Sequence, residues 1–155
     1  MTSFKEIYNS FFGKITDDMY MEWTEEDTQR DCKSILLNSI PGFEFPRFAL
    51  YDYDEEAESY NVDLTKEEIN IFAHLMLMEW IQRQVTSVEN TRMKYSGSDF
   101  KMTSQANHLD KLMKLKNEAE RMDRHNQRLY KRRKINSDGT ISSNWSTLFE
   151  ESATK

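Results

Sequence analysis

Three acidic residues at alternate positions, Asp52, Asp54 and Glu56, are the first candidates for metal chemistry in this sequence. Carboxylates spaced in this way supply ligands in twelve-residue calcium-binding loops. Such a loop needs Gly at its sixth position and Glu at its twelfth, where this chain has Ala57 and Asp63. The pattern therefore favours a solvated acidic loop, and we expect no metal and no other cofactor.

The candidate nucleophiles and bases are too scattered to form a catalytic set. His74, His108 and His125 do not pair with one another or with Cys32 at the spacing of a triad or a metal site. Glu79 follows His74 by five positions, and such a pair does not share a helix face well. Phosphate-binding glycine loops and nucleophile elbows are also missing from the sequence. We expect no catalytic residues, no metal ligands and no enzyme activity.

Basic residues gather near the end of the chain. Residues 131–134 are four consecutive cations, and three others repeat at intervals of seven, which places them on one helix face. The cluster could touch phosphates or act as a targeting tag, but cations also favour a helix C-terminus, and we favour that structural reading. The residues expected to make charged contacts, in assembly or with nucleic acid, are Lys114, Arg121, Arg128, Lys131, Arg132, Arg133 and Lys134.

Charge is divided unevenly along the sequence. Residues 1–60 carry 5 basic and 14 acidic side chains, whereas residues 101–134 carry 11 basic and 4 acidic ones. Opposite poles can attract copies head to tail and so produce rings or filaments. The poles can equally neutralise each other inside one subunit. Both readings stay open.

The composition suits a single, mostly helical domain. The chain has 155 residues, a net charge of −6, 37% hydrophobic and 31% charged residues, and only four Gly and two Pro. No apolar run reaches the roughly 20 residues that span a bilayer. The N-terminus lacks the pattern of a signal peptide, and the lone cysteine suits a reducing compartment. We expect synthesis in a reducing cytoplasm and no membrane partner.

The first half predicts two short helices and a hairpin. Residues 4–12 place apolar side chains on one face, and Gly13 ends that helix. A second helix starts with Thr24 as its cap and stops before Pro41. Residues 43–51, an edge strand because of Pro46, are expected to pair with residues 59–62 across the acidic segment 52–58.

Two long helices are predicted in the second half. The first begins with the capping box of Thr65 and Glu68 and is apolar from Ile69 to Ile81. Its expected core residues are Phe72, Leu75, Met76 and Trp80. A break at Gly97 lets the second helix, from Thr103 to Lys134, fold back antiparallel. Its expected packing seam is Leu112, Leu115, Ala119, Met122, Asn126 and Leu129, spaced as in heptads.

The fold class that follows is mainly α. We expect a small helical domain over residues 1–135, with two long antiparallel helices and a minor β-hairpin at 43–62, and an extended C-terminal arm over residues 136–155. Trp145, Leu148 and Phe149 lie in that otherwise polar arm. Large apolar residues in such a tail are typical docking anchors for a partner. The alternative is a disordered end or a tail that folds back on its own subunit.

Residues Gly97–Leu109, which follow a buried helix that ends near residues 91–93, resemble the corresponding part of head–tail connector (adaptor or neck) proteins of tailed bacteriophages. The resemblance covers about residues 65–134. It implies a structural virion protein whose copies form a ring, twelve in this family, under the portal. Such a ring binds the portal and the next neck or tail protein, and DNA passes through its channel without sequence-specific binding. The arm would correspond to the family's C-terminal extension, which commonly reaches the portal.

A different class of function is a small regulatory protein that binds nucleic acid through the basic helix 104–134. An accessory subunit of an enzyme is a third reading. Salt dependence separates the first two, because a nucleic-acid binder loses DNA affinity steeply as salt rises.

Overall fold

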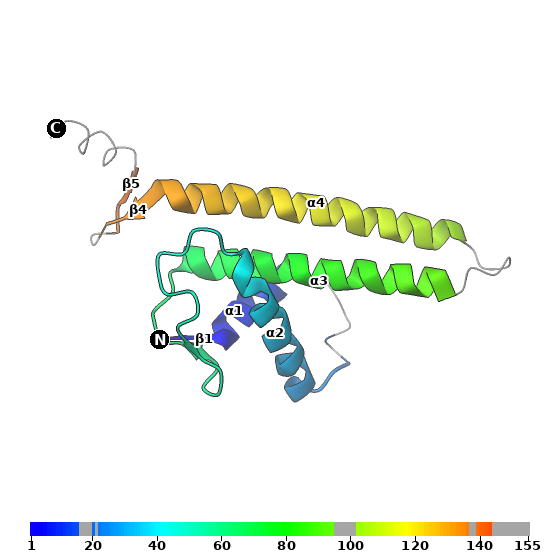
Figure 1. Cartoon of the computed structure of the whole chain (residues 1–155), viewed down its shortest axis with the longest axis horizontal. Coiled ribbons are helices and arrows are strands. Elements are labelled where there is room, and N and C mark those ends of the chain that lie inside the picture. Colours follow the sequence, from blue (N-terminus) through cyan, green and yellow to red (C-terminus); the bar gives the residue numbers. More distant parts are fainter. Residues whose placement is uncertain (16–19, 21, 95–101, 137–138, 144–155) are drawn as a thin grey trace.

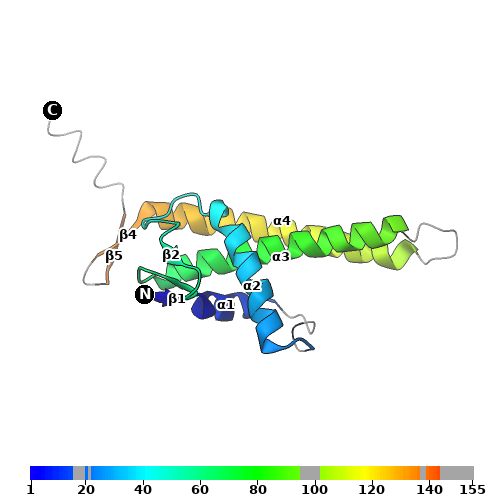
Figure 2. The same cartoon turned by 60° about the horizontal axis from the view of Figure 1, so that its bottom comes forward.

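The computed structural model describes residues 1–15, 20, 22–94, 102–136 and 139–143. Two long helices, α3 (Lys66–Lys94) and α4 (Met102–Arg132), lie side by side and antiparallel, and α1 and α2 pack against α3 (Figures 1 and 2). The fold is therefore mainly helical with a long antiparallel pair, as predicted. Gly97 falls outside the described residues. Within them, no helix combines the length and apolarity needed to cross a membrane.

Both short helices form where their end residues predict. In α1 (Phe4–Phe12), the Ser3 side chain accepts a hydrogen bond from the backbone of Lys5, and the helix ends at Gly13. In α2 (Glu25–Ser39), the Thr24 hydroxyl accepts from the backbone of Asp27 and satisfies a free N–H of the first turn. A 3₁₀ turn at Ile40–Gly42 (η2), which contains Pro41, ends this helix.

A minor β-hairpin forms within residues 43–62, as predicted, but its first strand lies elsewhere than predicted. The strands are β1 (Thr2–Ser3), β2 (Tyr53–Asp54) and β3 (Ser59–Tyr60), joined antiparallel in the order β1-β3-β2. Residues 43–51 form no strand, so the predicted first strand is wrong. Phe43 is buried and Phe48 packs beside it, with 5.8 Å between the ring centroids, so this segment follows the core as a loop. The Asp54 carboxylate accepts from the backbone of Glu56 and Ala57 and shapes the turn.

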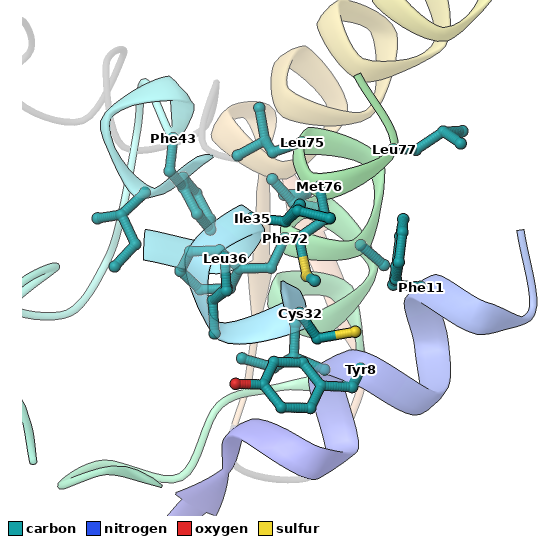
Figure 3. Packing of buried hydrophobic residues seen from close by; sticks show 14 of the residues in the cluster. Tyr8, Phe11, Cys32, Ile35, Leu36, Phe43, Phe72, Leu75, Met76 and Leu77 are labelled. Atoms are coloured by element: carbon teal, nitrogen blue, oxygen red, sulfur yellow. The ribbon is translucent and has the colours of Figure 1, made fainter. Parts of the chain in front are cut away.

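The core forms where α1, α2 and the loop 43–48 meet α3 (Figure 3). Phe72 lies at its centre, and its ring centroid is 5.2 Å from that of Phe43 and 5.5 Å from that of Tyr60. Phe72, Met76 and Leu75 are buried as predicted. Trp80 is only partly buried, so its assignment to the central core is corrected.

The predicted seam of α4 is only half right. Leu112 and Ala119 are buried, but Leu115 is 43% exposed and Met122 is 49% exposed. An ideal helix drifts about 20° per heptad, so the buried face does not follow a repeat of seven. It passes instead from Leu112 and Ala119 to three residues that the seam omitted: Asp123, Gln127 and Tyr130.

The start of the C-terminal arm doubles back. Strand β4 (Arg133–Ile135) pairs antiparallel with β5 (Ile141–Ser143). The connecting turn is closed by a 2.9 Å bond from the Asn136 N–H to the Thr140 carbonyl, and Gly139 has a φ of +80°, which favours glycine. No strand was predicted in this segment from the sequence.

Candidate functional site

Three of the predicted contact residues form a line on the outside of α4. Lys114, Arg121 and Arg128 are all exposed and are seven residues apart. They lie on the opposite side of the helix from Leu112 and Ala119, which pack towards α3. We call these three residues the basic ridge. Within the described part of the chain, none of them makes an ion pair, so their charges face solvent.

The first three of the four consecutive cations after Tyr130 have different surroundings. The Lys131 ammonium lies 4.1 Å from the centroid of the Phe45 ring. Arg132 is exposed, whereas Arg133 Nη1 is 3.4 Å from Glu67 Oε1 at the start of α3. Lys134 belongs to β4 and pairs with Ser142. Lys131 and Arg132 lie at the end of α4, where successive residues point about 100° apart, whereas Arg133 already belongs to β4.

Tyr130 anchors the end of α4 and was missed by the sequence analysis. Its hydroxyl donates to Glu68 Oε1 and accepts from the backbone N–H of Arg47, at 3.3 Å. The second oxygen of Glu68 accepts from the Thr65 backbone, at 2.7 Å, as the predicted capping box requires. A single carboxylate therefore joins the first turn of α3 to the last turn of α4.

Arg47 completes this anchor from the loop before the sheet. Its guanidinium lies 4.0 Å from the centroid of the Tyr130 ring and donates to the backbone carbonyls of Tyr130 and Arg133. Carbonyls in the last turn of a helix lack intrahelical partners, so a cation there is favourable. Burial, and then the bond to Glu68, raises the pKa of Tyr130, so it stays protonated as a donor.

A second buried polar group lies one helical turn earlier. Gln127 donates from Nε2 to Asp123 Oδ2, at 2.8 Å, and to the Gly42 carbonyl, at 3.0 Å. Its Oε1 accepts from the Glu44 backbone, at 2.8 Å. Burial is the main cause that raises the pKa of Asp123 to about 6. This buried face of α4 was not recognised from the sequence because Asp123 and Gln127 are polar, although their spacing of four residues matches a helix.

The acidic pole lies far from the basic ridge. The first turn of α2 contains Glu25, Glu26 and Asp27, all exposed, and this end of α2 points away from α4 (Figures 1 and 2). Arg30 is within 3.3 Å of two of these carboxylates and offsets part of their charge. The two poles therefore do not neutralise each other by direct contact within the described subunit.

Two of the candidate reactive side chains, Cys32 and His74, are buried or partly buried. Cys32 is fully buried in the core, and burial raises the pKa of its thiol to about 12. His74 is partly buried on α3, where burial and then the charge of Lys14 lower its pKa to about 4. Among the described residues, no group of three His, Cys, Asp or Glu side chains could hold a metal.

The predicted docking residues Trp145, Leu148 and Phe149 lie outside the described residues. Comparisons with known proteins produced no relative: no family model matches the chain, and neither a curated protein nor a solved structure matches it significantly.

Proposed function

We propose that this chain is a structural protein of the bacteriophage neck. Its copies form a ring, a dodecamer by the resemblance, that joins the portal to the tail or the next neck protein and continues the DNA channel. In this proposal the protein is not an enzyme, and it resides in the virion after synthesis in the host cytoplasm. The arm with Trp145, Leu148 and Phe149 reaches the portal or a neighbouring subunit.

The separation of charge carries this proposal. The basic ridge on α4 and the acidic turn of α2 are exposed on opposite sides of one subunit. Two different complementary surfaces on the same molecule favour a heterologous interface, which closes into a ring when the rotation permits. Exposed ion pairs are individually weak, at about 0–1 kcal/mol each, so several must act together and assembly is expected to depend on salt.

Charge reversal on the ridge tests this proposal. The triple variant Lys114→Glu, Arg121→Glu and Arg128→Glu should keep the helical circular dichroism spectrum, because the three side chains are exposed. It should lose the ring that the wild-type chain forms with its portal at low salt, as seen by mass photometry and electron microscopy. The matched control exchanges the same residues as Lys114→Arg, Arg121→Lys and Arg128→Lys and should assemble normally. Rings of the charge-reversed variant would contradict the proposal.

A regulatory nucleic-acid-binding protein is the second candidate, and the same exposed ridge supports it. Fluorescence anisotropy with duplex DNA at 50 and 200 mM salt separates the two functions. A protein whose function depends on phosphate contacts loses DNA affinity as salt rises. The logarithm of its binding constant falls with the logarithm of the salt concentration, with a slope of about −0.9 per phosphate contact. A connector that only surrounds passing DNA should bind duplex fragments weakly at both salt concentrations.

A further inference from the structure

The structure contains a cleft beside α4. It lies where the end of α2, the turn η2, α3 and α4 meet, and its volume is about 370 Å³. Four acidic side chains and one basic side chain are among the residues that line it: Glu44, Glu79, Glu120, Asp123 and Arg124. Leu75 and Met78 supply apolar surface to the same cleft.

Asp123 is the unusual member of this set. The residue is only 4% exposed, and one carboxylate oxygen, Oδ2, accepts the bond from Gln127. The other oxygen, Oδ1, is buried and has no hydrogen-bond partner among the described residues. A buried polar atom without a partner costs free energy, so such atoms usually have a partner that satisfies them. Asp123 Oδ1 is therefore an acceptor for which the described residues provide no donor.

The neighbouring charges make that donor a cation. Glu79 Oε1 is 3.5 Å from Arg83 Nε, and Glu120 Oε2 is 3.5 Å from Arg124 Nη2, so these two acids have partners. Across the described ranges, Asp123 and Glu44 make no ion pair. The cleft thus retains negative charge, which attracts a positively charged ligand.

Hydrogen bonds fix the residues that line the cleft in the absence of a ligand. Gln127 bonds simultaneously to Asp123, the Gly42 carbonyl and the Glu44 backbone. A Cβ on Gly42 would lie 2.8 Å from Leu75 Cδ2, so a larger residue there would require the Leu75 side chain to shift. A fixed acceptor loses little conformational entropy on binding.

We propose that this cleft binds an alkylammonium or alkylguanidinium group. Its N–H donates to the free oxygen of Asp123, while its methylene groups lie against Leu75 and Met78. The cation is organic, because three metal-ligating side chains do not come together in the described part of the molecule. A free polyamine and a Lys or Arg side chain of a partner protein both carry this chemistry. The site is separate from the basic ridge and does not depend on ring formation.

Titration of the ¹⁵N-labelled full chain with n-butylammonium tests the proposal. The expected result is saturable shifts of the Gly42 and Glu44 amides and of the Gln127 side-chain amide, with no such shifts from n-butanol. Asp123→Asn should weaken binding by about tenfold or more, because it removes a charged acceptor. Glu118→Gln, which removes one exposed charge elsewhere on α4, should leave the affinity unchanged.

Glu44→Gln provides a second variant at the exposed rim and should weaken binding severalfold with an intact fold. Saturable shifts that persist unchanged in Asp123→Asn, equal shifts from n-butanol, or no shifts at all would each overturn the proposal. Separate titrations with spermidine and with Nα-acetyl-lysine N-methylamide identify the source of the cation. Tighter binding of spermidine supports a free polyamine, and binding of the capped lysine at least as tightly supports a partner's side chain.

Discussion

At the scale of single residues, the Tyr130 hydroxyl joins three segments that are distant in the sequence. It bonds to Glu68 at the start of α3 and to the backbone of Arg47 in the loop before the sheet. The side chain is fully buried, so water cannot replace a lost bond. We therefore expect this hydroxyl to contribute more to the free energy of unfolding than an exposed hydroxyl does.

Tyr130→Phe should lower the free energy of unfolding by about 1–3 kcal/mol, because the substitution leaves buried polar groups without a partner. The ring and its contact with Arg47 remain, so the change reports on the hydroxyl alone. Urea unfolding followed by circular dichroism measures the effect. Tyr51→Phe is the matched control, since Tyr51 is 65% exposed, and it should change stability by less than about 0.5 kcal/mol. Equal effects of the two substitutions would contradict the proposed stabilising role of the Tyr130 hydroxyl.

Asp123 should give stability a specific pH dependence. Its pKa is raised from 3.8 to about 6 in the folded chain, so the folded state binds a proton that the unfolded state has lost between these values. The stability that this proton supplies is fully present below pH 4 and is lost as the pH rises through 6.

In Asp123→Asn, residue 123 no longer titrates, so this loss of stability with rising pH is removed. Relative to wild type, the variant should gain roughly 2–3 kcal/mol in stability between pH 4 and pH 7.5, since one pKa unit corresponds to about 1.4 kcal/mol. Urea unfolding of both proteins at the two pH values gives the difference. For Glu118→Gln, which alters an exposed carboxylate, the corresponding difference should stay close to zero. A flat difference for Asp123→Asn would mean that its pKa is not raised.

At the scale of elements, the α3–α4 pair is held by the face of α4 that its 3.6-residue period defines. Leu112 is 8% exposed and Leu115, three residues later, is 43% exposed. A heptad seam would bury both. The two leucines therefore distinguish the observed packing from a coiled-coil seam.

Leu112→Ala should lower the free energy of unfolding by about 2–5 kcal/mol, the usual cost of a Leu-to-Ala change in a core. Leu115→Ala should cost less than about 1 kcal/mol, because much of its side chain stays in water. Both substitutions have the same effect on helix propensity, so the difference in denaturant midpoint reports on burial. Similar midpoints for the two variants would favour the heptad seam.

At the scale of the whole molecule, the core and the arm should be separable. The last residue of the described core is Tyr130. A chain that ends at Ser143 retains this core and the hairpin of β4 and β5. It should unfold at the wild-type denaturant midpoint.

The same truncation should abolish attachment to the portal or to the neighbouring subunit, because it removes Trp145, Leu148 and Phe149. Co-sedimentation with portal particles measures this loss. Full-length chain with Trp145→Ala, Leu148→Ala and Phe149→Ala separates the docking side chains from the length of the arm. Normal attachment of both proteins would exclude a role for residues 144–155.

The sequence by itself determined the elements that depend on neighbouring residues. Several local features predict helices that the structure contains: the caps at Thr24 and Thr65, the stop at Pro41 and the apolar run from Ile69 to Ile81. These features follow from local hydrogen bonding and periodicity, which act over a few residues.

Only the tertiary structure decided how those elements meet. It paired Tyr130 with Glu68, turned residues 43–48 into a core-lining loop, and gave polar Asp123 and Gln127 buried places on α4. Polar side chains carry no apolar periodicity, and the hydrogen-bond partners of the buried Gln127 include Gly42 and Glu44, which are distant in the sequence. The basic ridge was predictable because exposed positions need only a shared helix face, whereas the cleft at Asp123 required the packing of three helices.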